Sequence, residues 1–345
     1  MVQFFDDYDE KYPDLILQIL EYFSITNIPV REKWRKENHD LGPIYDFIRK
    51  DNLQPRTIEK ICSKLCQLGY MERLRSSHRL AEFDDFISNV NITDDWKNSD
   101  HRKKLAYTFN SMVYGFNYVY NSFKQNVIPL LHDNIIDENT DKTTPETSVG
   151  SAFKLPDGIV TAKHCLEKAK AVAIKGFSGA ELAQAKILTH KNPNVDIAFI
   201  QLNKTIDAQL CFFDELNLMD EILVMGYPQI PKFLDFLTAE KALISAKEKA
   251  KLIVSRGSAA ATCGTIERTT LALITAKIQG GNSGGPVLNS KGAIVAVACA
   301  DTKIIKGESY DDLGYGVVTP ISDLHNLKND PSMELTGKVH FRDFD

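Results

Sequence analysis

The chain has 345 residues, of which 43% are hydrophobic and 25% are charged, and its formal net charge is -5. These proportions are typical of a globular protein and exclude a largely disordered, collagen-like or low-complexity chain. At roughly 150 residues per domain the length predicts about two domains. The acidic net charge argues against a surface that binds polyanions everywhere, although a local basic face is compatible with it.

Targeting signals and a disulfide framework are not expected. The first residues are acidic rather than basic, and no unbroken apolar run follows them, so we expect no secretory signal. The most apolar later run, residues 292–300, is about half as long as a membrane span. Six cysteines are scattered along the chain: Cys62, Cys66, Cys165, Cys211, Cys263 and Cys299. A cytoplasmic protein with free thiols and no membrane contact is predicted, because disulfide-dense scaffolds are usually short and secreted.

The first 125 residues are expected to form a mostly helical domain. Apolar residues recur at helical spacing from Leu15 to Phe23, a second short helix is predicted over 41–50, and a third starts at Pro55 and stops before Gly69. Short extended runs over 70–74 and 78–83 predict a hairpin. This order resembles a winged helix-turn-helix over residues 12–86. Cys62 and Cys66 are one helical turn apart but lack two further ligands, so we interpret them as core residues and expect no metal.

A long helix is predicted over residues 100–124. It carries seven aromatic residues, which we interpret as packing rather than as a ligand-stacking surface: Tyr107, Phe109, Tyr114, Phe116, Tyr118, Tyr120 and Phe123. The polar, acidic residues 133–147 predict a loop or linker. After it the sequence changes to short β-rich runs with glycine-bearing turns, which predict an all-β barrel or sandwich. These runs lie at 159–161, 172–174, 196–200, 222–225, 271–274, 293–297 and 316–318.

Three segments of the β-rich part carry the residue types of nucleophilic catalysis. Residues 161–165 read Thr-Ala-Lys-His-Cys, residues 196–198 read Asp-Ile-Ala, and residues 281–286 read Gly-Asn-Ser-Gly-Gly-Pro. They supply His164, Asp196 and Ser283 in that order along the chain. A serine hydroxyl needs a neighbouring base to become a nucleophile, and histidine titrates near working pH. We therefore expect these three residues to act together.

The three segments resemble the motifs of trypsin-like serine peptidases, and in texture they are nearest to the HtrA/Deg branch. The resemblance covers residues 126–330 and implies a domain of two β-barrels. It implies that His164 is the general base and later the acid, that Asp196 orients it, and that Ser283 is the nucleophile. The amides of Gly281 and Ser283 would bind the oxyanion. No cofactor is implied, the substrate is protein, and the alternative is an inactive protease fold retained as a scaffold.

Three departures from secreted trypsins bear on this resemblance. Asn282 stands before the nucleophile where trypsins have aspartate, so activation by insertion of a new N-terminus is not expected. Cys165 follows the histidine, but the matching strand over 148–150 holds no partner cysteine. The residues after Pro320 are too few for the PDZ domain of HtrA proteins, and residues 331–345 are set apart as a C-terminal tail.

The resemblance also places a primary substrate pocket. Its walls are expected from Lys277, Ile278, Gln279, Gly280, Cys299, Ala300, Asp301 and Gly316. Lys277 would favour an acidic substrate side chain and Asp301 a basic one. The favoured alternative is that these two residues pair with each other or point to solvent, so the specificity stays open.

The helical domain offers a basic surface formed by Arg56, Lys60, Lys64 and Arg75. A positive helix and wing suit phosphate contact, whereas many winged helices dock proteins. Two hypotheses follow. The favoured one is an intracellular serine endopeptidase whose N-terminal domain recruits substrate or a regulatory partner. The other is a DNA-binding or scaffolding protein with an idle protease fold.

Overall fold

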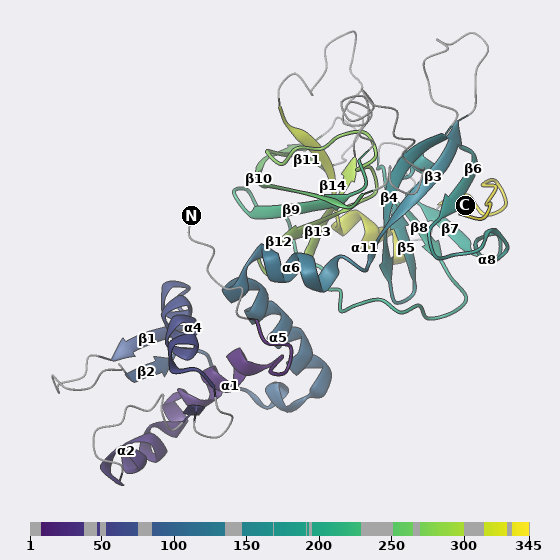
Figure 1. Cartoon of the computed structure of the whole chain (residues 1–345). Coiled ribbons are helices and arrows are strands. Elements are labelled where there is room, and N and C mark those ends of the chain that lie inside the picture. The colour runs from purple at the N-terminus through teal and green to yellow at the C-terminus, as the bar shows by residue number, and fades with distance from the viewer. Residues whose placement is uncertain are drawn as a thin grey trace, which may run out of the picture. The chain divides into compact units, whose positions relative to one another are not determined.

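The chain forms two compact units, residues 1–119 and residues 120–345, and each has its own hydrophobic core (Figure 1). The structure is a computed structural model. It describes residues 8–37, 47–48, 53–74, 85–134, 147–167, 169–190, 192, 195–228, 251–264, 270–299, 314–329 and 333–344.

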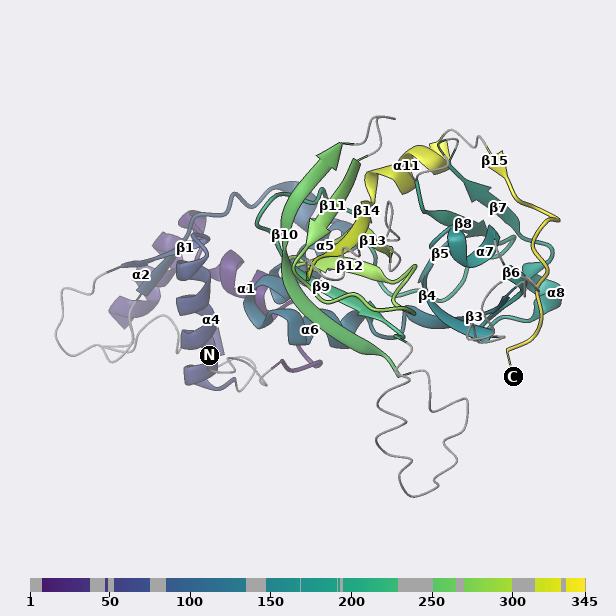
Figure 2. The same ribbon diagram turned by 90° about the horizontal axis from the view of Figure 1, so that it is seen from above.

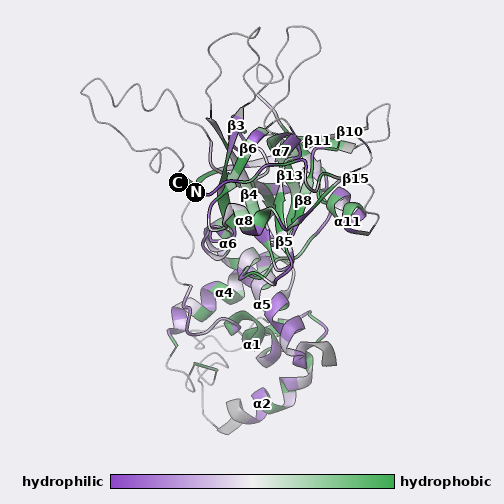
Figure 3. Cartoon of the chain, turned by 90° about the vertical axis from the view of Figure 1, so that its right-hand side faces the viewer, coloured by the Kyte–Doolittle hydropathy of each residue, from purple (hydrophilic) through white to green (hydrophobic). Residues whose placement is uncertain are grey.

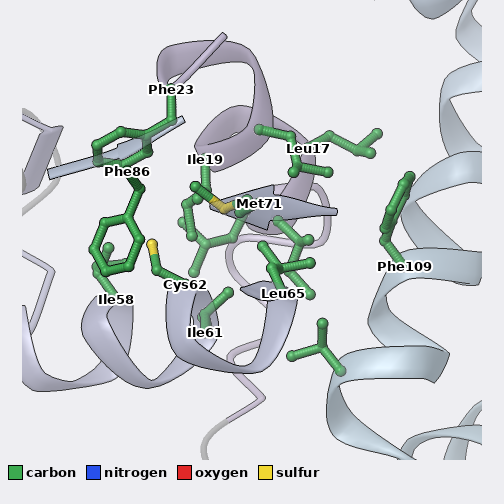
Figure 4. Packing of buried hydrophobic residues seen from close by; sticks show 14 of the residues in the cluster. Leu17, Ile19, Phe23, Ile58, Ile61, Cys62, Leu65, Met71, Phe86 and Phe109 are labelled. Carbon is green, nitrogen blue, oxygen red and sulfur yellow. The ribbon is translucent and has the colours of Figure 1, made fainter. Parts of the chain in front are cut away.

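The first unit combines helices with one short hairpin. Its elements are α1 (Leu15–Tyr22), a 3-10 turn (Ile25–Asn27), α2 (Ile28–Glu37), α4 (Pro55–Gln67), β1 (Met71–Leu74), β2 (Asp85–Ser88), a second 3-10 turn (Asp94–Lys97), α5 (Ser99–Tyr114) and α6 (Phe116–Phe123), within which the division between the units falls. Side chains from α1, α4, the hairpin and α5 point into one core (Figure 4). The apolar stripes predicted for α1 and α4 are buried there, except Leu68, which is exposed. Burying such stripes is the main stabilisation of short helices.

The details of this unit differ from expectation in three places. The partner of β1 is β2, with Met71 opposite Ser88, whereas the predicted second run over 78–83 lies entirely outside the described residues. Most of the helix predicted over 41–50 also lies outside them, and α2 was not predicted. The long helix over 100–124 is instead α5 and α6, because Gly115 adopts a φ of 71° that ends α5. Five of its seven aromatic residues are buried, which agrees with a packing role.

An ion-pair cluster joins two helices of this unit. The Arg102 guanidinium on α5 lies 2.9 Å from Asp14 Oδ2 and also contacts Glu21 on α1. All three side chains are a quarter to a third exposed. The two carboxylates raise the pKa of Arg102, and their shared partner ties the start of α5 to α1.

The second unit contains a seven-stranded antiparallel sheet followed by a closed six-stranded barrel (Figure 2). The sheet has the order β15-β7-β8-β5-β4-β3-β6 and the barrel β10-β11-β14-β13-β12-β9. The sheet strands are β3 (Val127–Asn134), β4 (Thr147–Leu155), β5 (Gly158–Thr161), β6 (Ala169–Ile174), β7 (Lys186–Thr189), β8 (Ala198–Gln201) and β15 (Met333–Glu334). The barrel strands are β9 (Glu221–Gly226), β10 (Ile253–Gly264), β11 (Thr270–Ile274), β12 (Pro286–Asn289), β13 (Ile294–Cys299) and β14 (Gly316–Pro320).

Every β-rich run predicted from the sequence coincides with or overlaps one of these strands, so the all-β expectation for this part is confirmed. Short helices α7 (His164–Glu167) and α8 (Gly179–Leu182) and the longer α11 (Ser322–Asn329) complete the unit. Hydrophobic residues concentrate on the strands, as Figure 3 shows by colour. Strands that are buried on both faces, such as β12 and β13, carry unbroken apolar runs.

The residues set apart as a C-terminal tail pair with both edges of the seven-stranded sheet. At one edge β15 pairs with β7, placing Met333 opposite Thr189. At the other edge the Val172 amide of β6 donates to the carbonyl of His340, and the Arg342 amide donates to the carbonyl of Val172. The Arg342 guanidinium also forms an ion pair with Asp133 of β3, in which Nε lies 2.8 Å from Oδ2. One segment therefore connects the two open edges and closes the sheet into a first barrel.

Candidate active site

The pairing of β5 with β8 brings His164 and Asp196 together. The two strands are antiparallel, and Thr161 at the end of β5 lies opposite Ala198 at the start of β8. His164 follows Thr161 by three residues and Asp196 precedes Ala198 by two, so both lie beyond the same end of the strand pair. The imidazole Nδ1 is 2.6 Å from Asp196 Oδ2, and the His164 backbone amide donates to Asp196 Oδ1 at 2.9 Å.

These two hydrogen bonds control the charge of the pair. Burial opposes the imidazolium, but the hydrogen bond to Asp196 and the neighbouring Cys165 together outweigh it and raise the pKa of His164 above its ordinary value. Burial also opposes the carboxylate, whereas His164 lowers the pKa of Asp196 overall. The imidazole side chain remains 33% exposed, so its second nitrogen can meet a substrate or a nucleophile.

A buried thiol lies behind the aspartate. Cys299, at the end of β13, lies 3.0 Å from the Thr319 hydroxyl of β14, and its buried thiol is close enough to Asp196 for the two to interact electrostatically. Burial and the negative charge of Asp196 raise the pKa of the Cys299 thiol well above its ordinary value, so it stays protonated and is able to donate. The sequence predicts Cys299 in a pocket wall, which stays a prediction; its thiol is buried near Thr319 and Asp196.

Ser283 lies in a loop made of two consecutive turns. The Asn282 amide donates to the Gln279 carbonyl, and the Gly285 amide donates to the Asn282 carbonyl, each at 2.9 Å. Gly281 and Gly284 occupy the third position of these turns with φ of 99° and 85°. Residues that carry a side chain rarely adopt such backbone angles, so each turn requires glycine at this position. The Gly-Asn-Ser-Gly-Gly motif is therefore what this backbone path demands.

The same loop is bound to the first barrel. The Ser151 amide of β4 donates to the Ser283 carbonyl at 2.8 Å. A Cβ on Gly284 would stand 2.2 Å from the Ser151 carbonyl oxygen and 2.7 Å from the Ala162 nitrogen. Ala162 precedes His164 by two residues, so the Ser283 loop lies directly against the segment that leads into His164.

The residues expected to line a substrate pocket are placed in different environments. Ile278 and Gly316 come together, because a Cβ on Gly316 would stand 2.8 Å from the Ile278 side chain. Lys277, Gln279 and Gly280 are exposed. Ala300 and Asp301 lie outside the described residues. Whether Lys277 and Asp301 pair with each other or point to solvent therefore stays open.

The basic residues predicted on the first unit share one face of α4. Arg56, Lys60 and Lys64 are spaced four residues apart, and the first two are exposed. Arg75 lies outside the described residues. Cys62 is fully buried in the core of this unit, where desolvation raises the pKa of its thiol.

Two further features concern the described cysteines and helices. Five cysteines are free thiols: Cys62, Cys66, Cys165, Cys211 and Cys299. Among the helices that the structure describes, none has the length and hydropathy needed to cross a bilayer.

The sequence reasoning did not identify several residues that shape the site. Ser151, Tyr227 and Thr319 make the hydrogen bonds that hold the Ser283 loop or the Asp196 partner. Ser151 lies in the buried part of β4, and a buried hydroxyl needs a hydrogen-bond partner, but no local pattern identifies that partner.

Comparisons with known proteins found a matching family model and one curated relative. Residues 151–297 match the family described as trypsin-like peptidase domain. Protease Do-like 2, chloroplastic, from Arabidopsis thaliana is 28% identical over 180 residues, which are 51% of this chain and 27% of the relative. The chain thus spans about a quarter of the length of that relative.

Solved structures of two proteases are also similar. The active form of the Rv3671c protease from M. tuberculosis has 17% identity and a TM-score of 0.43, over 62% of this chain and 84% of that one. The HtrA-type protease AlgW with a tripeptide has 16% identity and a TM-score of 0.43, over 64% of this chain and 62% of that one. The predicted resemblance to trypsin-like serine peptidases near the HtrA branch is confirmed by the family match over residues 151–297 and by the curated relative.

Proposed function

We propose that this protein is a serine endopeptidase that cleaves protein substrates through a triad of His164, Asp196 and Ser283. The observation that carries the proposal is the 2.6 Å hydrogen bond between His164 and Asp196. It lies beside a serine loop whose two turns require the glycines that the motif supplies. The catalytic domain comprises residues 126–330, and the first barrel also uses residues 333–344.

The reaction proceeds through an acyl-enzyme. The Ser283 hydroxyl attacks the peptide carbonyl while the second nitrogen of His164 takes its proton, and the amides of Gly281 and Ser283 bind the oxyanion. The imidazolium then protonates the leaving amine as the C–N bond breaks. A water molecule, deprotonated by His164, hydrolyses the ester and returns the serine. Asp196 keeps the proton of His164 on Nδ1, so that the other nitrogen is a base.

Covalent labelling tests this function. A fluorophosphonate probe is expected to label the wild-type chain, and Ser283→Ala is expected to abolish both labelling and cleavage of fluorescein-labelled casein. Loss of a catalytic serine lowers kcat about a millionfold in a related catalytic system. Persistent failure of the folded wild-type chain to label would contradict the proposal. Proteome-wide cleavage profiling of wild type against Ser283→Ala then gives the specificity.

The first unit is proposed to recruit substrate or a regulatory partner, through an arrangement that resembles a winged helix. Helix, helix and hairpin, in the order α1, α4, β1 and β2, support this interpretation. Reversing the charge of Arg56, Lys60 and Lys64 to glutamate is expected to change which proteins are cleaved while leaving the rate of fluorophosphonate labelling unchanged. An unchanged cleavage profile would count against the role. A cytoplasmic location is proposed from the free thiols of the described cysteines.

The basic face of α4 also supports a second candidate, nucleic-acid binding. Three cations on one helix face suit contact with phosphates, and such binding weakens steeply with salt. Wild type and Ser283→Ala are then expected to shift a DNA duplex equally at low salt, and the charge-reversed variant is expected not to shift it. The absence of a shift at saturating protein would remove this candidate.

A further inference from the structure

Ser151 on β4 has all of its polar groups hydrogen-bonded, and its amide and hydroxyl join the first barrel to the second. Its amide donates to the Ser283 carbonyl at 2.8 Å, and its carbonyl accepts from the Thr161 hydroxyl at 2.8 Å. Its hydroxyl donates to the Gly281 carbonyl at 2.7 Å and accepts from the Tyr227 amide at 2.8 Å. The side chain is fully buried, so these bonds do not compete with bulk water.

The hydroxyl acts on one particular peptide group. The Gly281 carbonyl belongs to the peptide between Gly281 and Asn282, and the amide of that peptide donates to the Gln279 carbonyl at 2.9 Å. Both polar ends of this peptide are therefore held. It lies between the amides of Gly281 and Ser283, which are the two oxyanion donors in the proposed function.

The backbone around this peptide has little stiffness of its own. Gly280 has open space where a Cβ would lie, and Gly281 has a φ of 99°. Two consecutive glycines rotate at low cost, so the direction of the Gly281 amide depends on what holds the carbonyl that follows it. The side-chain oxygen of the neighbouring Asn282 does not help to hold the loop, because this buried Oδ1 has no hydrogen-bond partner.

We propose that the Ser151 hydroxyl is a positioning residue for the oxyanion site: it fixes the Gly281–Asn282 peptide and thereby aims the two amides. This inference rests on the proposed function. The hydroxyl does not touch the substrate; it works through the loop, and the Tyr227 amide at the end of β9 holds the hydroxyl oxygen in place.

The test compares Ser151→Ala with Thr161→Val in the full chain. Each substitution removes one buried hydroxyl at nearly constant volume, but among the described residues the Thr161 hydroxyl donates to the Ser151 carbonyl and not to the Gly281 carbonyl. Ser151→Ala is expected to lower kcat on fluorescein-labelled casein by about 10- to 100-fold with KM within about twofold, because a misaimed oxyanion donor loses part of the effect of a deleted one. Amide hydrogen exchange of residues 279–285 is expected to accelerate in the same variant. Thr161→Val is expected to lower the melting temperature while leaving kcat within about threefold and this exchange unchanged.

Equal kcat and equal exchange in the two variants would overturn the inference. If Ser151→Ala does not fold, Ser151→Cys keeps a weaker donor of similar volume and must show the same selective loss of kcat in smaller size; an unchanged kcat there would also overturn it. If the wild type neither labels nor cleaves, the proposed function fails. The exchange of residues 279–285 then still decides whether Ser151 holds the loop.

Discussion

Asp196→Asn is the substitution whose effect follows most directly from the geometry. Asp196 accepts two hydrogen bonds, from His164 Nδ1 on one oxygen and from the His164 backbone amide on the other. The backbone amide has a fixed direction and can only donate. An asparagine must therefore keep its oxygen toward that amide and turn its NH2 group toward Nδ1.

This orientation places the imidazole in the wrong tautomer. Nδ1 must accept from the asparagine NH2, so the proton of the neutral ring moves to Nε2, and Nε2 is then unable to take the proton of Ser283. In related serine peptidases this exchange lowers kcat about ten-thousandfold. That factor corresponds to about 5.4 kcal/mol in activation free energy. We expect a loss of this order at pH 7, with KM and the fold preserved.

Casein hydrolysis over a range of pH measures the effect. Asp214→Asn is the control, because Asp214 is also partly buried and also accepts hydrogen bonds, from Lys291 and Asn289 on one oxygen and from the Glu215 amide on the other. It lies outside the His164 pair, so we expect kcat to change less than about threefold. A loss below about tenfold in Asp196→Asn, or an equal loss in both variants, would refute the tautomer argument.

Three further outcomes are expected. Because Asp196 raises the pKa of His164 above 6.5, the neutral base is lost as pH falls, and wild-type activity should reach half its plateau above pH 6.5; a midpoint below that value in the wild type would contradict the pKa direction. Gly284→Ala should reduce the free energy of unfolding in urea by on the order of 3 kcal/mol, because a backbone oxygen lies 2.2 Å from the new Cβ. Gly176→Ala is its control, with a similar φ of 88° and nothing within 4 Å, and equal losses would show that backbone strain alone is responsible. Arg102→Met should lower the stability of the first unit by about 1 kcal/mol, since its partners are partly exposed, and leave casein cleavage unchanged; an unaltered urea midpoint for that unit would refute the contribution.

The sequence predicts the candidate catalytic residues, but it does not predict the residues whose hydrogen bonds hold the Ser283 loop in place. His164, Asp196 and Ser283 lie in short contiguous motifs, and such motifs reflect local backbone needs, as the two glycine turns show. The Ser151 hydroxyl and its acceptor on Gly281 are 130 residues apart in the chain. No local pattern connects them, because the contact exists only after two barrels have formed.

Helix boundaries show the same division between local and long-range information. The start of α4 at Pro55 and its stop before Gly69 are local signals, and both were predicted. The break between α5 and α6 was missed, since aromatic residues continue at helical spacing across Gly115. A glycine within an apolar stripe is compatible with a continuous helix, and only the tertiary environment selects the φ of 71°.

The closure of the first barrel by residues 333–344 has a consequence for biosynthesis. The two edges that this segment pairs, β7 and β6, are made before the whole second barrel, and the segment that covers them is made after it. On a ribosome the first barrel is therefore open until synthesis has passed both barrels. Its strand edges must wait for a contact more than 140 residues away along the chain, from Thr189 to Met333. Such distant pairing is slow to form, and exposed edges are prone to pair with other chains. A stalled or shortened nascent chain would thus expose unpaired strand edges. Chaperones and proteases would then encounter the first barrel as an open sheet.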